Sequence, residues 1–239
     1  MRSFVLLAFA IGAGVTNANA RADLIHRSAT LAELLPQQAA SFAAVIPPDR
    51  KVAWTLRVPD IASPHGVIVF VSPRDSGGPP GSWSEVLEQE NLVWVSAEHF
   101  GNTTPTAQRI LAAVMGLALV QRDYKIDRQR IYIAGMSGGG RVASKAIATS
   151  PQLFTGAIYL CGADPLPTGA AAAATSKRFV FVTGTRDFNR REMKHVARRY
   201  SKLGVRNVLV LDIPGMGHEL VDAGHLEEAI QYLDAAEHR

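Results

Sequence analysis

The chain contains 239 residues, of which 47% are hydrophobic and 19% are charged, and its formal net charge is +4. This balance is typical of a folded globular protein and excludes a disordered or fibrous one. The length fits a single domain with a large core. No motif of a nucleic-acid-binding protein is present, so nucleic acid is not an expected partner.

The first twenty residues have the three parts of a signal peptide. Arg2 provides the positive charge, residues 4–15 are apolar, and residues 18–20 have the A-x-A pattern of a cleavage site. The apolar run is too short to span a bilayer as a stable helix. We therefore expect an exported protein, periplasmic or secreted, without stable membrane insertion after cleavage. An uncleaved anchor or a buried helix is the alternative.

Residues 21–239 are expected to form one domain, with its core at about residues 52–239, because strand and helix patterns alternate there without a long linker. Residues 29–46 are compatible with a helix. Short apolar runs predict strands at 52–58, 66–71, 92–95, 130–134, 155–160, 178–183 and 207–213. Helical spacing or capping signals predict helices at 85–90, from Thr104-Pro105 onward, and at 138–149, 193–203 and 226–233. The alanine-rich run 169–175 is either a loop or a short helix.

This alternation predicts an α/β fold, with a mostly parallel, doubly wound sheet and helices on both faces. In such sheets the active site lies at the carboxyl ends of the strands. The segments that follow the predicted strands are 72–83, 96–104, 135–141, 161–168, 184–190 and 214–220.

The sequence Gly135-Met136-Ser137-Gly138-Gly139 matches the G-x-S-x-G pattern of a nucleophile elbow. An apolar strand leads into it and an alanine-rich helix leads out, which is the setting that this motif requires. Small residues at both ends permit a tight turn that exposes the serine at a helix N-terminus, where a developing anion is favoured. A glycine-rich turn with a bystander serine is the alternative.

From about residue 52 onward the chain resembles the α/β-hydrolases, and among them the small polyhydroxybutyrate depolymerase and feruloyl or acetylxylan esterases. The stretches that carry this resemblance are 127–132, the elbow at 135–140, and 151–154. It implies a catalytic order of serine, acid and histidine. The longest segment between strands near the site, 161–177, is too short for a large cap domain.

The acid implied by the resemblance is Asp187, just after the predicted strand 178–183, with Asp164 as the alternative. The implied base is His218, in a glycine-rich loop before the last helix, with His225 as the alternative. Cys161, the single cysteine, excludes an intrachain disulfide. It follows an apolar run and is expected to be buried; a catalytic thiol is the less favoured interpretation.

An oxyanion hole needs two backbone donors. Gly138 N–H is the expected first donor, and the second is expected in the loop after strand 66–71. Relatives often have His-Gly in this loop, whereas this chain has Ser72-Pro73, and proline has no N–H to donate. Arg74 N–H is the donor favoured by position. The presence of Ser72-Pro73 in place of His-Gly also favours an alternative function, that of a binding protein that kept the fold and lost catalytic activity.

An open site without a large cap suits a small or polymer-linked ester. The candidates to line it are Trp83, His99, Phe100, Arg141 and Phe188, unless the rings simply close the core. Arg74, Arg141 or Arg186 is a candidate to bind a substrate carboxylate. A basic cluster at residues 186–199 is interpreted as a solvated helix face, with a surface for an anionic polymer or a membrane as the alternative.

These observations together predict an exported serine hydrolase that cleaves a carboxylic ester through an acyl-enzyme on Ser137, with Asp187 and His218. A peptidase or a thioesterase with the same triad is a second interpretation. No metal and no organic cofactor is expected, because the histidines lack ligand spacing and no phosphate-binding loop is present. The sequence indicates no oligomeric state.

Overall fold

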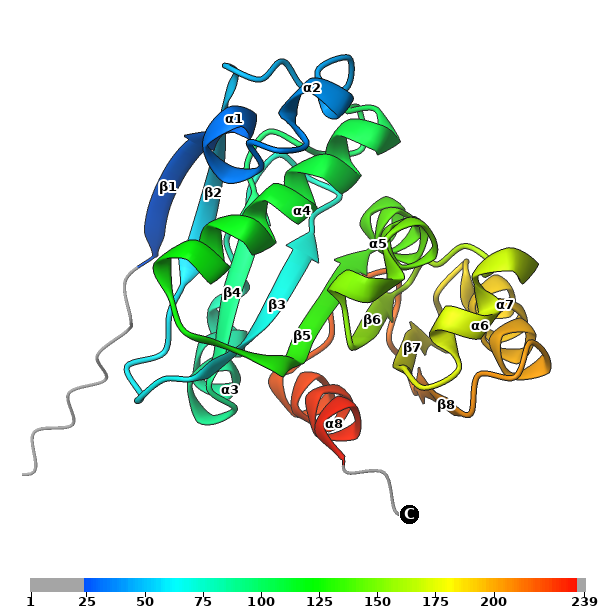
Figure 1. The fold of residues 1–239 in the computed structure, drawn as a ribbon. Helices are drawn as coiled ribbons and strands as arrows, with labels where there is room; N and C mark the ends of the chain where they lie inside the picture. The colour runs from blue at the N-terminus through cyan, green and yellow to red at the C-terminus, as the bar shows by residue number, and fades with distance from the viewer. Residues whose placement is uncertain (1–23, 236–239) are drawn as a thin grey trace, which may run out of the picture.

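A computed structural model describes residues 24–235, which form one eight-stranded sheet with helices on both faces (Figure 1). The predicted signal peptide, residues 1–20, lies outside the described residues. Among residues 24–235, no helix is both long enough and apolar enough to cross a membrane.

The strands lie in the order β1-β2-β4-β3-β5-β6-β7-β8. β2 pairs antiparallel with both β1 and β4, and every pairing from β4 to β8 is parallel. The carboxyl ends of the six parallel strands therefore point the same way, and the loops that follow them meet at one edge. The strands are β1 (Ile25–Thr30), β2 (Lys51–Arg57), β3 (His65–Val71), β4 (Leu92–Ala97), β5 (Ile126–Met136), β6 (Gly156–Leu160), β7 (Arg178–Gly184) and β8 (Asn207–Ile213).

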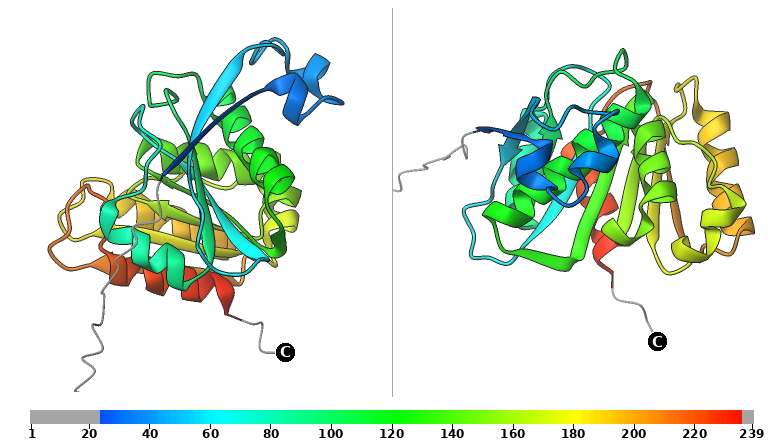
Figure 2. Two further views of the ribbon diagram at one scale, coloured as in Figure 1. Left: turned by 90° about the vertical axis from the view of Figure 1, so that its left-hand side faces the viewer. Right: turned by 45° about the horizontal axis from the view of Figure 1, so that its top comes forward.

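The helices divide between the two faces of the sheet, as Figure 2 shows. One face is covered by α1 (Leu31–Leu34), α2 (Ala39–Phe42), α4 (Thr106–Asp123), α5 (Gly138–Thr149), α6 (Ala171–Ala174) and α7 (Arg190–Lys202). The other face is covered by α3 (Ser84–Gln89) and α8 (Ala223–Asp234). Short 3₁₀ helices occur at Gly81–Trp83, Pro151–Leu153 and Thr168–Ala170.

The predicted fold class is confirmed, and each predicted strand is present. The helix expected at residues 29–46 is wrong, because β1 ends at Thr30 and two short helices follow. Thr30 caps α1 through a reciprocal capping box with Glu33. The expected capping role of Thr104 is also not found, since α4 begins after Pro105 without a side-chain cap. The alanine-rich run is helical.

A cluster of aromatic rings fills the core beneath α3 and α8. Trp83 is buried, packs edge-on against Phe70 and Trp94, and donates its indole N–H to the carbonyl oxygen of Val221 at 2.8 Å. This indole therefore joins the loop before α8 to the α3 region. The expectation that Trp83 lines a substrate site is wrong, because its ring is enclosed by the core.

We predict that Trp83→Ala lowers the free energy of unfolding by about 3–5 kcal/mol, because truncating a buried aromatic side chain leaves a cavity. Urea titration followed by circular dichroism measures the loss. Phe42→Ala is the matched control: Phe42 is 39% exposed, so its truncation leaves no enclosed cavity and should cost clearly less than that of Trp83. Equal effects of the two substitutions would contradict the assignment of Trp83 to the core.

Candidate active site

Ser137 occupies a strained turn between β5 and α5. Its backbone is left-handed, with φ 54° and ψ −120°, a conformation that costs about 1–3 kcal/mol outside glycine. The Ser137 N–H donates to the carbonyl oxygen of Leu160 at 2.7 Å. A Cβ on Gly139 would collide with the carbonyl oxygen of Val71, and one on Gly135 would lie 2.5 Å from the Gly139 backbone. This close contact between backbones explains the glycines of the pattern.

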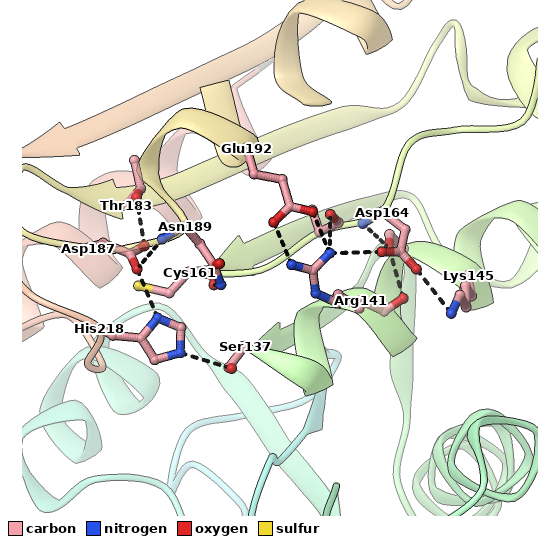
Figure 3. A network of polar contacts seen from close by, with 12 residues as sticks. Ser137, Arg141, Lys145, Cys161, Asp164, Thr183, Asp187, Asn189, Glu192 and His218 are labelled. Atoms are coloured by element: carbon pink, nitrogen blue, oxygen red, sulfur yellow. Dashed lines mark hydrogen bonds and ion pairs between the residues drawn. The ribbon is translucent and has the colours of Figure 1, made fainter. Parts of the chain in front are cut away.

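Three side chains from separate loops form one hydrogen-bonded chain at this turn (Figure 3). His218 Nε2 lies 2.9 Å from Ser137 Oγ, and His218 Nδ1 lies 2.8 Å from Asp187 Oδ1. An ionised carboxylate only accepts hydrogen bonds, so Nδ1 carries the proton and Nε2 accepts from the serine hydroxyl. Because the loops follow β5, β7 and β8, the parallel sheet brings these residues together.

Asp187 is held in the ionised form by its surroundings. Thr183 Oγ1 donates to its Oδ2 at 2.7 Å, and Asn189 N–H donates to its Oδ1 at 3.0 Å. Burial by itself raises the pKa of this carboxyl, but the donated hydrogen bonds, led by that of Asn189, outweigh burial and leave the pKa of Asp187 below its usual value. Asp187 therefore carries its charge at neutral pH and orients His218.

The alternative acid and base lie in other networks. Asp164 forms ion pairs with Arg141 at 3.1 Å and Lys145 at 3.0 Å. His225 lies at the start of α8, where its Nδ1 is 2.8 Å from Asp222. The structure thus brings Asp187 and His218 together with Ser137 and places Asp164 and His225 in separate contacts.

Cys161 lies directly beside this chain of residues, which its sequence setting did not indicate. Its backbone is left-handed and its Sγ lies 3.5 Å from the Glu219 carbonyl oxygen. Burial, followed by the charge of Asp187, raises the pKa of the thiol to about 12. Cys161, Asp187 and His218 are the one group among residues 24–235 with the side chains for a metal ion. They do not fit one, because the thiol is protonated and both histidine nitrogens are engaged.

The structure does not support Arg74 as an oxyanion donor, because Arg74 N–H already donates to Ser72 Oγ at 3.0 Å. Gly138 N–H lies free at the N-terminus of α5, where helix amides lack partners. The exposed side chain of Asn102, in the loop after β4, lies against Gly138. Its Oδ1 is the atom nearest to the place that a Gly138 Cβ would take, and its Nδ2 lies 3.0 Å from the same place. Sequence reasoning missed Asn102.

Arg109 is a second residue that the sequence analysis missed. It lies buried on α4, and its guanidinium donates to three backbone carbonyls, those of Ser72 at 2.8 Å, Phe100 at 3.0 Å and Gly138 at 3.5 Å. No carboxylate pairs with it among residues 24–235. Burial lowers its pKa. One buried cation thus joins the loops after β3 and β4 to the nucleophile turn.

Of the remaining residues expected to line the site, only Phe188 contacts the hydrogen-bonded chain. Its ring is 77% exposed and stacks on His218 with 4.1 Å between centroids. Phe100 is buried in the core, so the expectation that it lines the site is wrong. His99 is exposed in the loop after β4, with left-handed backbone.

Arg141 is engaged in ion pairs. It forms a two-pronged salt bridge with Glu192 at 2.6 and 2.7 Å, and it also contacts Asp164. This pairing joins α5 to α7 beside the serine (Figure 3). The expectation that Arg141 binds a substrate carboxylate is therefore not supported, because two carboxylates of the chain already occupy its guanidinium.

We predict that the Cys161 thiol is unreactive in the native protein. With a pKa of about 12, only about one thiol in ten thousand is ionised at pH 8, and the thiolate is the reactive form. Ellman's reagent at pH 8 should detect no thiol in the native protein and one per chain in guanidinium chloride. Rapid modification of the native protein would instead support the catalytic-thiol interpretation.

No protein-family model and no curated protein sequence matches this chain. Solved structures do match its fold. A fungal esterase from Rhizomucor miehei superposes with a TM-score of 0.66 at 12% identity, over 91% of this chain and 84% of its own. An S-formylglutathione hydrolase from Staphylococcus aureus gives 0.61 at 14% identity, over 88% and 94%. A ferulic acid esterase gives 0.61 at 16% identity, over 88% and 96%. The chain therefore has the α/β-hydrolase fold, and residues 24–235 contain no large cap.

Proposed function

We propose that this protein is an exported serine esterase, which hydrolyses a carboxylic ester through an acyl-enzyme on Ser137. The observation that carries the proposal is the hydrogen-bonded chain from Ser137 through His218 to Asp187, on a strained turn at the carboxyl edge of the sheet. The names of the structural neighbours, mostly esterases, are consistent with it. Export is supported by the signal-peptide pattern of residues 1–20, which leaves residues 21–239 as the mature domain.

In the proposed reaction, Ser137 Oγ attacks the ester carbonyl carbon while His218 Nε2 takes the hydroxyl proton. The carbonyl π-electrons move to oxygen, and the ionised Asp187 stabilises the imidazolium. His218 then gives its proton to the leaving alcohol as the carbon–oxygen bond breaks. A water molecule, deprotonated by the same nitrogen, releases the acid and restores the serine. Apart from the ester and the water molecule, these steps use only residues of the chain.

The negative oxygen formed during attack needs donors on the side of Ser137 away from His218. Gly138 N–H is the first donor in this proposal, and the side-chain amide of Asn102 is the second. Three observations support Asn102: Pro73 has no N–H, Arg74 N–H is already engaged, and the Asn102 amide lies against Gly138. A side-chain amide can replace a backbone donor in this role. The proposal removes the reason to prefer a non-catalytic binding protein.

Asn102 is positioned by its own loop and by Arg109. Its backbone N–H donates to the Pro73 carbonyl at 3.0 Å, and the neighbouring Gly101 N–H donates to Asp75 Oδ1 at 3.0 Å. The guanidinium of Arg109 donates to the carbonyl of Ser72, in the loop after β3, and to that of Phe100, in the loop after β4. The two loops therefore hold the backbone of Asn102 in place before a substrate arrives, and a fixed donor position is the condition for stabilising a transition state.

We predict that the mature protein hydrolyses p-nitrophenyl acetate and butyrate and that Ser137→Ala lowers kcat by about 10⁶-fold. Asp187→Asn should lower kcat by about 10⁴-fold, because the amide favours the wrong tautomer of His218. The matched control is Asp164→Asn, a nearby carboxyl outside the hydrogen-bonded chain, whose rate should stay within about threefold of the wild type. Release of p-nitrophenolate measures each rate.

Equal rates for the wild type and Ser137→Ala would contradict the proposal, as would a failure of a fluorophosphonate probe to label Ser137. A parallel panel of thioester and peptide substrates tests the alternatives with the same triad. If a thioester or a peptide is hydrolysed faster than every ester, the protein is a thioesterase or a peptidase that uses the same triad.

We predict that Asn102→Ala lowers kcat by about 10²–10³-fold with little change in KM, because an oxyanion donor acts mainly in the transition state. Asn102→Asp, which keeps the shape and removes the donor, should lower kcat at least as much. Both variants should keep the wild-type free energy of unfolding, since the side chain is exposed. An Asn102→Ala enzyme with more than about a third of the wild-type kcat would show that another group is the donor.

A further inference from the structure

The positive charge of this chain is concentrated beside the candidate active site. Residues 186–202, the segment that contains α7, include seven basic and two acidic residues, a net charge of +5, whereas the whole chain carries only +4. The rest of the protein is therefore nearly neutral. A charge of one sign gathered in one place attracts ligands of the opposite sign.

Part of this charge is neutralised within the fold. Arg190 and Lys194 both bond Asp212, at distances of 2.6–2.8 Å. Glu192 pairs with Arg141 outside the segment, so it neutralises none of the segment's basic side chains. The side chains of Arg191, His195 and Arg198 have no carboxylate partner among residues 24–235. All three are exposed.

These three residues form a row on one side of α7, because their spacings of four and three residues match the helical repeat. The row extends about 10 Å along the helix axis. Arg191 and Arg198 place two like charges on this side of the helix, whereas a face serving only solubility would mix both signs. We call the row, which comprises Arg191, His195 and Arg198, the basic row.

The basic row lines a hollow that begins at Phe188, next to His218. The hollow has a volume of about 630 Å³ and is lined by Phe188, Arg191, Glu192, Lys194, His195 and Arg198. The Phe188 ring also stacks on the His218 ring at 4.1 Å. Phe188 contacts His218 and also lines the hollow. Phe188 therefore lies between His218 and the basic row.

We propose that this hollow is a binding subsite for an anionic part of the substrate, so that the natural ester belongs to a chain bearing carboxylates or similar anions. The inference rests on the proposed esterase function and adds the substrate class. Arginine side chains bind carboxylates with two parallel hydrogen bonds, which favours this group over a neutral chain. Phe188 supplies apolar contact to the part of the substrate between the ester and the first anion.

An anionic membrane is a weaker candidate for the same charge. A helix that binds a bilayer surface presents an apolar face for insertion below its basic residues. The apolar side chains of α7, namely Met193, Val196, Ala197 and Tyr200, are all buried against the sheet. Phe188 alone supplies exposed apolar surface beside the basic row, so the face fits a chain in solution better than a lipid surface.

A pair of matched esters tests the subsite. Mono-4-nitrophenyl suberate carries a carboxylate at the far end of its chain, and its methyl ester is the same molecule without the charge. We expect the wild type to have the higher kcat/KM for the charged ester. Arg191→Gln combined with Arg198→Gln should lower that value about three- to tenfold, and leave the neutral ester unchanged, as exposed ion pairs are individually weak. The control is Arg128→Gln, which changes an exposed arginine near the amino end of β5, at the other end of that strand from Ser137.

A second measurement does not depend on turnover. Fluorescence anisotropy follows binding of fluorescein-labelled tetraglutamate to the Ser137→Ala protein. We expect salt-sensitive binding that the double arginine substitution weakens about three- to tenfold and that Arg128→Gln leaves unchanged.

The outcomes separate the two proposals. If the neutral ester is hydrolysed but the charged ester gains nothing and the double variant binds tetraglutamate as well as the wild type, the subsite is overturned and the esterase stands. If neither ester reacts while binding still depends on Arg191 and Arg198, the esterase is overturned and the anion site stands. Binding to phosphatidylglycerol vesicles through these arginines, without tetraglutamate binding, would overturn the subsite in favour of a lipid surface.

Discussion

The left-handed backbone at Ser137 is the constraint on which the site depends. This conformation is unfavourable for serine, so it persists only because neighbouring backbones leave no alternative. The N–H of Ser137 is bound to the end of β6, and Gly139 is pressed against the carbonyl of Val71 at the end of β3. Because β3, β5 and β6 are neighbours in one parallel sheet, their hydrogen-bond register fixes these contacts. The exposed position of the serine oxygen is thus a consequence of the sheet.

Buried charges of opposite sign lie on the two sides of this turn. The carboxylate of Asp187 lies behind His218, and the guanidinium of Arg109 lies behind Gly138 and the loops after β3 and β4. In the proposed reaction a proton moves toward the anionic side and negative charge grows on the cationic side. Both charges therefore favour the charge separation of the transition state. The structure keeps each buried ion satisfied with hydrogen bonds, the carboxylate by three donors and the guanidinium by backbone carbonyls.

The features that can be predicted from the sequence are marked by patterns within a short stretch of residues, whereas the features that cannot be predicted have no such pattern. The buried strands and the nucleophile turn are apolar runs and a glycine pattern that can be recognised within ten residues. β1 is an edge strand with mostly exposed side chains, so it has neither an apolar run nor an alternating pattern. Arg109 binds residues 9, 29 and 37 positions away in sequence, and only the folded loops reveal these partners. Position in the sequence alone favours Arg74 as a donor, and only the folded turn shows that its N–H already donates to Ser72 Oγ.

The two ends of the active site are built differently. Ser137, Asp187 and His218, the residues of the proposed triad, lie on loops at the carboxyl ends of core strands, whereas the proposed anion subsite lies on the exposed face of a single helix. The Arg141–Glu192 salt bridge joins that helix to α5, whose first residue follows the nucleophile. Substitutions on the exposed side of α7 leave the buried contacts of Met193 and Tyr200 intact. In the proposed function, the exposed face of α7 can therefore change the charge of the accepted substrate without altering the contacts of Ser137.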